Sequence, residues 1–292
     1  MNREYIIARH RIRLEGEELL QAVDKIEGFR PFMVTTTGSP LVTVTSEKTE
    51  TMQVPSFQEE EYSFVFEDIH STFGRTSDGY LFKATPNEGD PQYLWGEKDG
   101  NVIYIKGRLD ENSMTTRLVR FALWIAYGMS TARLNTIAVH TSTITYKGKS
   151  VLFLGESGTG KSTHTRLWRE HISGATLLND DSPILRIVDG RPWIFGSPWS
   201  GKTHCYKNEE YPLAACVRLA QAPYNKIQKL RTVQAYAAIH PSCPPEFAYD
   251  EYLYDGISQT LNVVLRQTPF YYLECLPNVE AALLSCKTIF GE

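Results

Sequence analysis

Cysteine is scarce in this chain, with five residues among 292. They are widely spaced and none forms a C-x-x-C pair, which argues against a disulfide framework or a zinc knuckle. Long apolar runs are lacking too, because no stretch approaches 18 uncharged apolar residues and the first ten residues have no secretory-signal core. We therefore expect reduced thiols, no membrane partner and a cytoplasmic location.

Positive charge is not in excess either. Lys and Arg number 30 against 34 Asp and Glu, a formal net charge of -4, and no dense basic block occurs. A protein that mainly binds nucleic acid needs basic side chains to neutralise phosphates, so nucleic acid is not an expected partner. The length of 292 residues and the apolar content of 42% favour two domains with substantial cores.

The amino-terminal part, residues 1–112, is predicted to be a smaller, β-rich α+β domain. Apolar and polar residues alternate there with period two, which is typical of short, mainly antiparallel strands. The alternating segments are 4–14, 32–36, 62–66, 79–83 and 101–105. Helical spacing of apolar residues predicts one helix over 16–26. Since no chemical motif stands out, this domain is assigned by elimination to acceptor recognition or oligomerisation.

A helix over 113–135, opened by polar residues from 110 onward, is expected to connect this domain to a second one at 136–292. From residue 136, strands and helices alternate with hairpins among them, which predicts a mixed sheet in an α/β domain. Predicted strands are 136–145, 150–154, 175–178, 183–188, 192–195, 213–222 and 270–275. Predicted helices are 161–171, 231–240, 245–265 and 278–289.

A complete G-x-x-x-x-G-K-[ST] loop stands at 155–162, directly after the apolar run 150–154. Backbone N–H groups can wrap a triphosphate only where tight turns lack Cβ atoms. In this motif Lys161 would reach the β- and γ-phosphates, and Ser162 would place its hydroxyl on Mg²⁺. The residues predicted to bind ATP are Gly155, Glu156, Ser157, Gly158, Thr159, Gly160, Lys161, Ser162 and Thr163.

Two carboxylates, Asp180 and Asp181, end an apolar strand about twenty residues further on. Phosphoryl transfer needs one carboxylate to hold Mg²⁺ and can use another to accept the proton of the attacking hydroxyl. Neighbouring side chains of a strand point to opposite faces, so the division of labour between the two stays open. A simple turn at 181–183 is the alternative interpretation.

Together, His140, the segment 147–162 and the triplet 179–181 resemble the catalytic domain of HPr kinase/phosphorylase. There a histidine precedes the strand that leads to G-x-S-G-x-G-K-S, and an Asp-Asp pair follows. The loop is also similar to that of ATP-dependent phosphoenolpyruvate carboxykinase. The resemblance covers about residues 136–290 and implies a carboxykinase/HPr-kinase-like P-loop fold, ATP and Mg²⁺ as cofactors, His140 beside the phosphates, and a homo-oligomer. The strand pattern alone equally fits His140 as a packed core residue.

The glycine loop 195–204 departs from the HPr kinases, whose own downstream signature and docking segment are missing, which argues against HPr as the substrate. Similar Gly-x-Pro-Trp-x-Gly segments occur in HPr-kinase-like proteins. Our hypothesis is a second anion-binding loop, in which Trp199 stacks on a ring and Lys202 meets an anion. A surface turn with a packed Trp is the alternative. Further substrate candidates are Ser200, His204 and Arg218.

Arg218 is a guanidinium within an apolar strand, so it must find an anionic partner. The sequence leaves three partners for Arg218 open: a nucleotide, a substrate, or a carboxylate of the protein in an internal salt bridge.

The predicted activity is that of a kinase. The γ-phosphoryl group of Mg-ATP would pass to a hydroxyl, such as that of a serine, on a protein, peptide or small molecule. Lys161, Asp180, Asp181 and His140 would be catalytic, while Ser162 and the two aspartates would bind the metal. A nucleotide-binding regulatory or scaffold protein without phosphotransfer is the first alternative, and a carboxykinase-like enzyme is the second.

Overall fold

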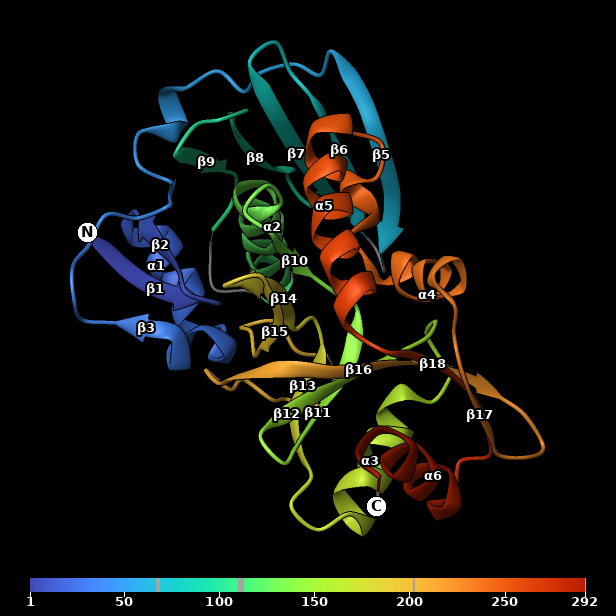
Figure 1. Cartoon of the computed structure of the whole chain (residues 1–292). Coiled ribbons are helices and arrows are strands. Elements are labelled where there is room, and N and C mark those ends of the chain that lie inside the picture. Colours follow the sequence, from blue (N-terminus) through green and yellow to red (C-terminus); the bar gives the residue numbers. More distant parts are fainter. Residues whose placement is uncertain (67–68, 110–112, 202, 292) are drawn as a thin grey trace. The chain divides into compact units, whose positions relative to one another are not determined.

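The computed structural model describes residues 1–66, 69–109, 113–201 and 203–291. The described chain divides into two compact units, each with its own mixed sheet and helices (Figure 1). Unit 1 comprises Met1–Leu134 and Pro245–Tyr254, and unit 2 comprises Asn135–Pro244 and Asp255–Glu292. The chain is therefore a mixed α/β protein. The segment Pro245–Tyr254 comes late in the sequence but belongs to unit 1.

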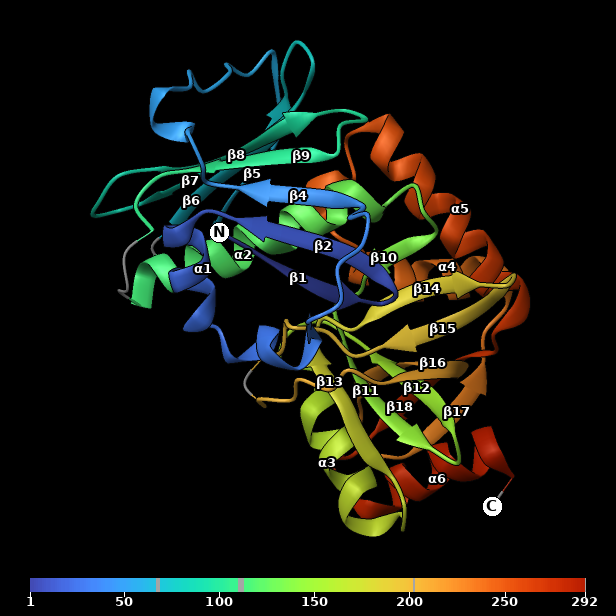
Figure 2. The same cartoon turned by 90° about the vertical axis from the view of Figure 1, so that its left-hand side faces the viewer.

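Unit 1 contains a mixed sheet that curls as a half-barrel around one helix, α2 (Figure 2). Its strands are β1 (Asn2–Ile7), β2 (His10–Glu15), β3 (Met33–Val34), β4 (Val42–Thr45), β5 (Glu59–Phe66), β6 (Ile69–Arg75), β7 (Gly79–Pro86), β8 (Gln92–Glu97) and β9 (Val102–Lys106). Its helices are α1 (Glu17–Asp24), α2 (Ser113–Thr131) and the 3-10 turns η1 (Glu27–Phe32), η2 (Thr49–Thr51) and η4 (Pro245–Phe247). The order is β3-β1-β2-β4-β9-β8-β7-β6-β5. The pairs β2–β4 and β4–β9 are parallel and the other described pairs antiparallel, as the sequence predicts for most of this unit.

The first alternating segment, 4–14, is a hairpin rather than one strand. Its turn places Ala8 and Arg9 at φ of 48° and 62°, and two positive φ values in succession are typical of a type I′ turn. Neither residue is the Gly or Asn that marks such turns in a sequence, so the local pattern gives no sign of the break.

The helix predicted over 245–265 begins too early, because the first residues of this range have another structure. Phe247 is buried in unit 1, where its ring lies 5.3 Å from that of Phe73. Asp250 Oδ1 accepts hydrogen bonds from Tyr80 Oη at 2.9 Å and from the main-chain N–H of Leu253 at 2.7 Å. Because Asp250 caps a new helix there, the regular helix α5 (Glu251–Gln267) begins six residues later than predicted.

Unit 2 contains a mixed sheet in the order β10-β14-β15-β16-β12-β11-β13, and β18 pairs with both β16 and β17. Its strands are β10 (Thr136–Ala138), β11 (Thr141–Tyr146), β12 (Lys149–Leu154), β13 (Thr176–Asp181), β14 (Ile184–Val188), β15 (Arg191–Phe195), β16 (Glu210–Gln221), β17 (Lys226–Lys229) and β18 (Phe270–Cys275). Its helices are α3 (Lys161–His171), α4 (Thr232–Ile239), most of α5, α6 (Val279–Phe290) and the 3-10 turn η3 (His240–Ser242).

Strand direction brings several carboxyl ends of unit 2 together. β16 runs parallel to β12, and β18 runs parallel to β16. β11 is antiparallel to both β12 and β13, so β13 shares the direction of β12. The strand predicted over 136–145 is wrong as a single element, because β10 pairs with β14 whereas β11 pairs with β12 and β13. The carboxyl ends of β13, β12, β16 and β18 therefore lie along one edge, where α/β sheets place ligands.

Helix α3 lies beside α6 on one face of this sheet (Figure 1), and its bounds confirm the prediction of 161–171. Its fully buried Trp168 donates from Nε1 to Ser285 Oγ of α6 at 2.9 Å and to His164 Nε2 at 3.2 Å. Phe153 of β12 packs edge-to-face on His164, at 4.7 Å between ring centroids. These contacts fix the loop that joins β12 to α3 at both ends.

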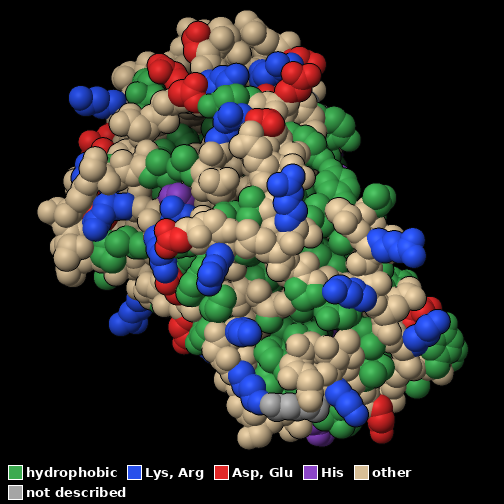
Figure 3. Space-filling model, viewed as in Figure 1, with side chains coloured by type: hydrophobic (Ala, Val, Ile, Leu, Met, Phe, Trp, Pro, Cys, Tyr) green, Lys and Arg blue, Asp and Glu red, His purple; other side chains and the backbone are tan. Residues whose placement is uncertain are grey.

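None of the helices in the described residues combines the length and apolar character needed to span a bilayer. On the face shown in Figure 3, the described Lys and Arg side chains are interspersed with acidic, apolar and neutral ones.

Candidate functional site

The loop 155–160 leaves β12 at the carboxyl edge of the sheet and opens α3. Gly158 and Gly160 have φ of 82° and 99°, left-handed values that other residues rarely adopt. A Cβ at either position would meet nothing within 4 Å, so the backbone conformation rather than crowding demands glycine. Thr159 closes the turn by donating from Oγ1 to the carbonyl of Glu156 at 2.8 Å.

Lys161 folds back over this loop. Its Nζ donates to the carbonyls of Gly155 at 2.7 Å and Glu156 at 3.1 Å, and lies 3.4 Å from His140 Nε2. Burial lowers the pKa of the ammonium, and Asp181 and Asp180 oppose that shift. The cation is thus held at the mouth of the loop with two carboxylates nearby.

Ser162 and Asp180 form the next contact of the site. The Ser162 hydroxyl donates to Asp180 Oδ1 at 3.1 Å, and Asp180 is buried. Among the described residues, no group of three or more His, Cys, Asp or Glu side chains could hold a metal alone. Mg²⁺ at a nucleotide site needs only one or two protein oxygens, since phosphates and water complete its shell. This hydroxyl and carboxylate fit that need.

Asp181 contacts His140 rather than Ser162. His140 Nδ1 lies 3.2 Å from Asp181 Oδ1, while its Nε2 faces Lys161. A neutral imidazole with its proton on Nδ1 satisfies both contacts, since it donates to the carboxylate and accepts from the ammonium. His140 is about half exposed, so the interpretation as a packed core residue is wrong.

The glycine loop after β15 lies against the aspartate pair. Gly201 N donates to the carbonyl of Asp180 at 2.6 Å, and Ser200 forms a bridge with Asp181. A Cβ on Gly201 would lie 2.9 Å from that carbonyl, so only glycine permits this approach. The loop fixes the backbone that carries both carboxylates.

Trp199 and Ser200 are buried, at 3% and 2% exposure. The Trp199 ring is therefore not available to stack on a ligand, and the alternative of a packed Trp holds. Lys202 lies outside the described residues. His204 is exposed beside Tyr206, and no contact joins it to the aspartates or to the loop 155–160 among the interactions described. In the described part of this loop, Trp199 and Ser200 are thus packed within the protein, and the expected contact of Lys202 with an anion lies outside the described residues.

Arg218 lies beside the loop 155–160, because β16 pairs with β12 at Leu154 and Arg218. Its Nη2 is 3.3 Å from Glu156 Oε1, and its Nη1 donates to the carbonyl of Ala238 at 3.3 Å. The internal salt bridge is thus formed, with a residue of the loop itself. The guanidinium remains next to any phosphate that the loop would hold.

Sequence reasoning assigned no role to three residues that shape the site. Gln221, at the end of β16, donates from Nε2 to the loop carbonyl of Gly158 at 3.1 Å. Asn179 donates from Nδ2 to Ser197 Oγ at 3.3 Å and accepts from the N–H of Ser182 at 2.9 Å, and both Asn179 and Ser197 are fully buried. The one local signal was the position of Asn179 directly before the aspartates.

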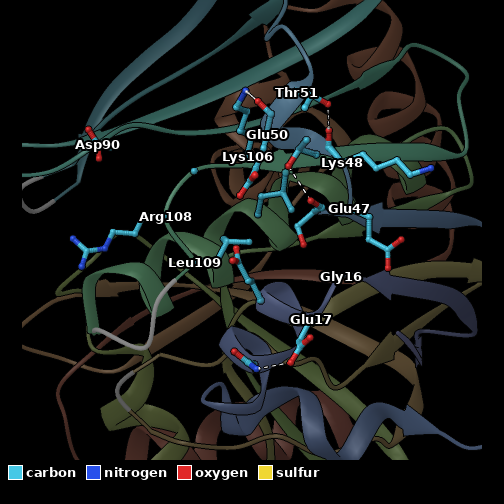
Figure 4. Close-up of a pocket in the computed structure, with 16 residues that line it drawn as sticks. Gly16, Glu17, Glu47, Lys48, Glu50, Thr51, Asp90, Lys106, Arg108 and Leu109 are labelled. Carbon is cyan, nitrogen blue, oxygen red and sulfur yellow. Dashed lines mark hydrogen bonds between the residues drawn. The ribbon is translucent and has the colours of Figure 1, made fainter.

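Unit 1 contains a separate open cavity of about 940 Å³, seen in Figure 4. Its carboxylates are Glu17, Glu18, Glu47, Glu50 and Asp90, and its cations are Lys48, Lys106 and Arg108. Lys106 Nζ donates to the main-chain carbonyls of Glu50 at 3.0 Å and Met52 at 2.8 Å. With charges of both signs and no nucleotide motif, it offers less defined chemistry than unit 2.

No protein-family model matches this chain, and no curated protein matches it. A functional conclusion therefore depends on the geometry in unit 2.

Proposed function

We propose that the chain is an ATP-dependent kinase of the HPr-kinase-like type, which transfers the γ-phosphoryl group of Mg-ATP to a hydroxyl group. One observation carries the proposal: Ser162 of the loop and Asp180 of a distant strand meet at 3.1 Å, with Lys161 over the same loop. An ordinary glycine turn that binds no ligand does not require a hydroxyl, a carboxylate and an ammonium group to meet beside it. The acceptor is a hydroxyl on a protein, peptide or small molecule.

The roles of the two aspartates follow from their contacts. Asp180 is buried and bonded to Ser162, so these two residues are assigned to Mg²⁺, which supplies charge neutralisation on the phosphate oxygens. Lys161 adds a second positive charge to the β- and γ-phosphates. Thr163 and the backbone of the loop complete the nucleotide contacts.

Asp181 is assigned as the proton acceptor. Its carboxylate is 37% exposed and is oriented by His140, so an incoming hydroxyl can reach it. The acceptor O–H proton passes to Asp181, the acceptor oxygen bonds to the γ-phosphorus, and the bond from that phosphorus to the bridging oxygen breaks to release ADP. Atoms and charge balance without any further reactant.

The sheet supports the same family assignment. An antiparallel β11 between β12 and β13, and the antiparallel pair β14–β15, give a mixed sheet rather than strict βα alternation. The resemblance to HPr kinase and the ATP-dependent carboxykinases implies such a mixed core.

The test measures ATP binding and ADP release separately in the variant Asp181→Asn. We expect ATP affinity within about threefold of the wild type, since Asp181 is not assigned to the nucleotide, and ADP release with hydroxyl acceptors reduced by about 10²–10⁴-fold. Asp189→Asn is the matched control, because Asp189 is exposed in the turn between β14 and β15. Wild-type protein that binds ATP but releases no ADP with any acceptor would support a nucleotide-binding scaffold instead.

A further inference from the structure

A cavity of about 540 Å³ adjoins the phosphate loop on the side opposite the aspartates in strand order. Its floor is formed by the loop and the start of α3, and its walls by the ends of β16 and β18. The lining residues are Gly158, Thr159, Gly160, Thr163, His164, Leu219, Gln221, Ala222, Cys275, Leu276 and Pro277. Small-molecule sites commonly have volumes of about 300–1,000 Å³.

The cavity lining differs in charge from the β13 side of the loop. The β13 side presents Asp180, Asp181 and His140 around Lys161. Among the described residues that line the cavity, none is Asp, Glu, Lys or Arg. The cavity thus suits an uncharged group attached to a polyphosphate.

We propose that this cavity receives the nucleoside, the ribose and base, of the nucleotide whose phosphates the loop holds. The inference rests on the proposed function and names the part of the substrate that unit 2 uses for specificity. Leu219, Ala222 and Leu276 provide apolar surface for a flat base, while the Gln221 amide stands at the rim as a hydrogen-bonding group. Gln221 is already tied to the loop through Gly158, so the base site and the phosphate site are coupled.

The walls of the cavity are fixed before any ligand arrives. Asn225 accepts from the N–H of Leu276 at 2.8 Å and donates to Asn278 Oδ1 at 3.0 Å. Asn278 in turn caps α6 by accepting from the N–H of Ala281. Ala222 N donates to the carbonyl of Cys275 at 3.2 Å, which joins the two walls. A site held in this way loses little conformational entropy on binding.

The deciding experiment compares ATP with inorganic tripolyphosphate, both with magnesium, by calorimetry on the full chain. We expect ATP to bind about tenfold more tightly or better, and Ala222→Trp to remove that advantage while tripolyphosphate binding is retained. Ala237→Trp is the matched control, because Ala237 is exposed on α4 and outside the cavity. Retained tripolyphosphate binding also shows that the Ala222→Trp protein is folded.

Cysteine alkylation tests the same proposal on the unaltered protein. Cys275 lines the cavity and Cys205 does not, and both are free and half-buried. ATP should slow alkylation of Cys275 but not of Cys205, and tripolyphosphate should slow neither. Equal affinities for ATP and tripolyphosphate, or unprotected Cys275 at saturating ATP, would overturn the nucleoside site alone. If neither ligand binds, the proposed function fails, and this inference fails with it.

Discussion

The hydroxyl of Ser162 donates to the carboxylate of Asp180 at 3.1 Å, although the two residues come from different elements. Ser162 is in the first turn of α3, and Asp180 is near the end of β13, which is separated from β12 by β11. Because β11 is antiparallel to both neighbours, β12 and β13 run in the same direction and end at one edge of the sheet. The contact therefore links a local motif to the topology of the whole sheet.

Asp180→Asn should weaken the magnesium dependence of nucleotide binding. The amide keeps the shape of the side chain and can still accept from Ser162, but the negative charge that attracts Mg²⁺ is gone. We expect the half-saturating Mg²⁺ concentration for ATP binding to rise about tenfold or more. A magnesium titration followed by calorimetry measures it, and an unchanged midpoint would contradict the assignment of Asp180 to the metal.

Lys161→Ala should reduce ATP affinity by about 10–100-fold, because it removes the cation that lies over the phosphate loop. Lys149→Ala is the matched control, since Lys149 is exposed at the opposite end of β12. Equilibrium binding of ATP to both variants gives the comparison. Equal affinities would show that Lys161 does not contact the phosphates.

Comparing Gly160→Ala with Gly174→Ala distinguishes the cost of backbone strain from an effect on ATP binding. Both glycines have left-handed φ, 99° and 87°, and a Cβ on either meets nothing within 4 Å. Each substitution should therefore destabilise the fold by a similar amount, about 1–2 kcal/mol. Chemical denaturation should show this similarity, whereas ATP binding should weaken only in Gly160→Ala. Loss of binding in both variants would point to a general effect of reduced stability.

Protonation of His164 should make the protein less stable in mild acid. Burial lowers the pKa of this imidazole from 6.5 to about 4 in the folded chain. Between these values the unfolded chain binds a proton that the folded chain does not, so the unfolding free energy falls as pH decreases from 6.5 to 4. The full loss is on the order of 3 kcal/mol. Above pH 6.5 this residue adds no further pH dependence.

Denaturant unfolding at several pH values, in His164→Gln and His171→Gln, checks this expectation. His171 is exposed at the end of the same helix and provides the matched control. His164→Gln should flatten the slope between pH 6.5 and 4, whatever its stability at neutral pH. Identical slopes in the two variants would refute the role of His164.

Local patterns in the sequence predicted much of unit 2. The helix 161–171 and the strand 270–275 have the bounds expected from them. Both have clear local markers, since a glycine turn precedes α3 and β18 is a short apolar and aromatic run. The glycine loop 155–160 and the aspartate pair stand out in the sequence for the same reason, because each is defined within a few neighbouring residues.

Partners that meet through strand pairing could not be predicted in this way. Arg218 reaches Glu156 only because β16 runs parallel to β12, and no local pattern specifies that neighbour. The cavity at Gln221 and Cys275 depends on the same pairing and on β18. The stacking role expected of Trp199 is wrong for a related reason, since its burial follows from the packing of its loop rather than from its sequence.

The return of residues 245–254 to unit 1 has a consequence for biosynthesis. Phe247 packs against Phe73 and Trp124, and Asp250 receives the Tyr80 hydroxyl, so unit 1 is incomplete until these residues are present. A ribosome adds them only after the phosphate loop has been translated. The amino-terminal half therefore cannot finish folding ahead of the rest, and the aromatic surface that Phe247 covers stays open until this segment is made.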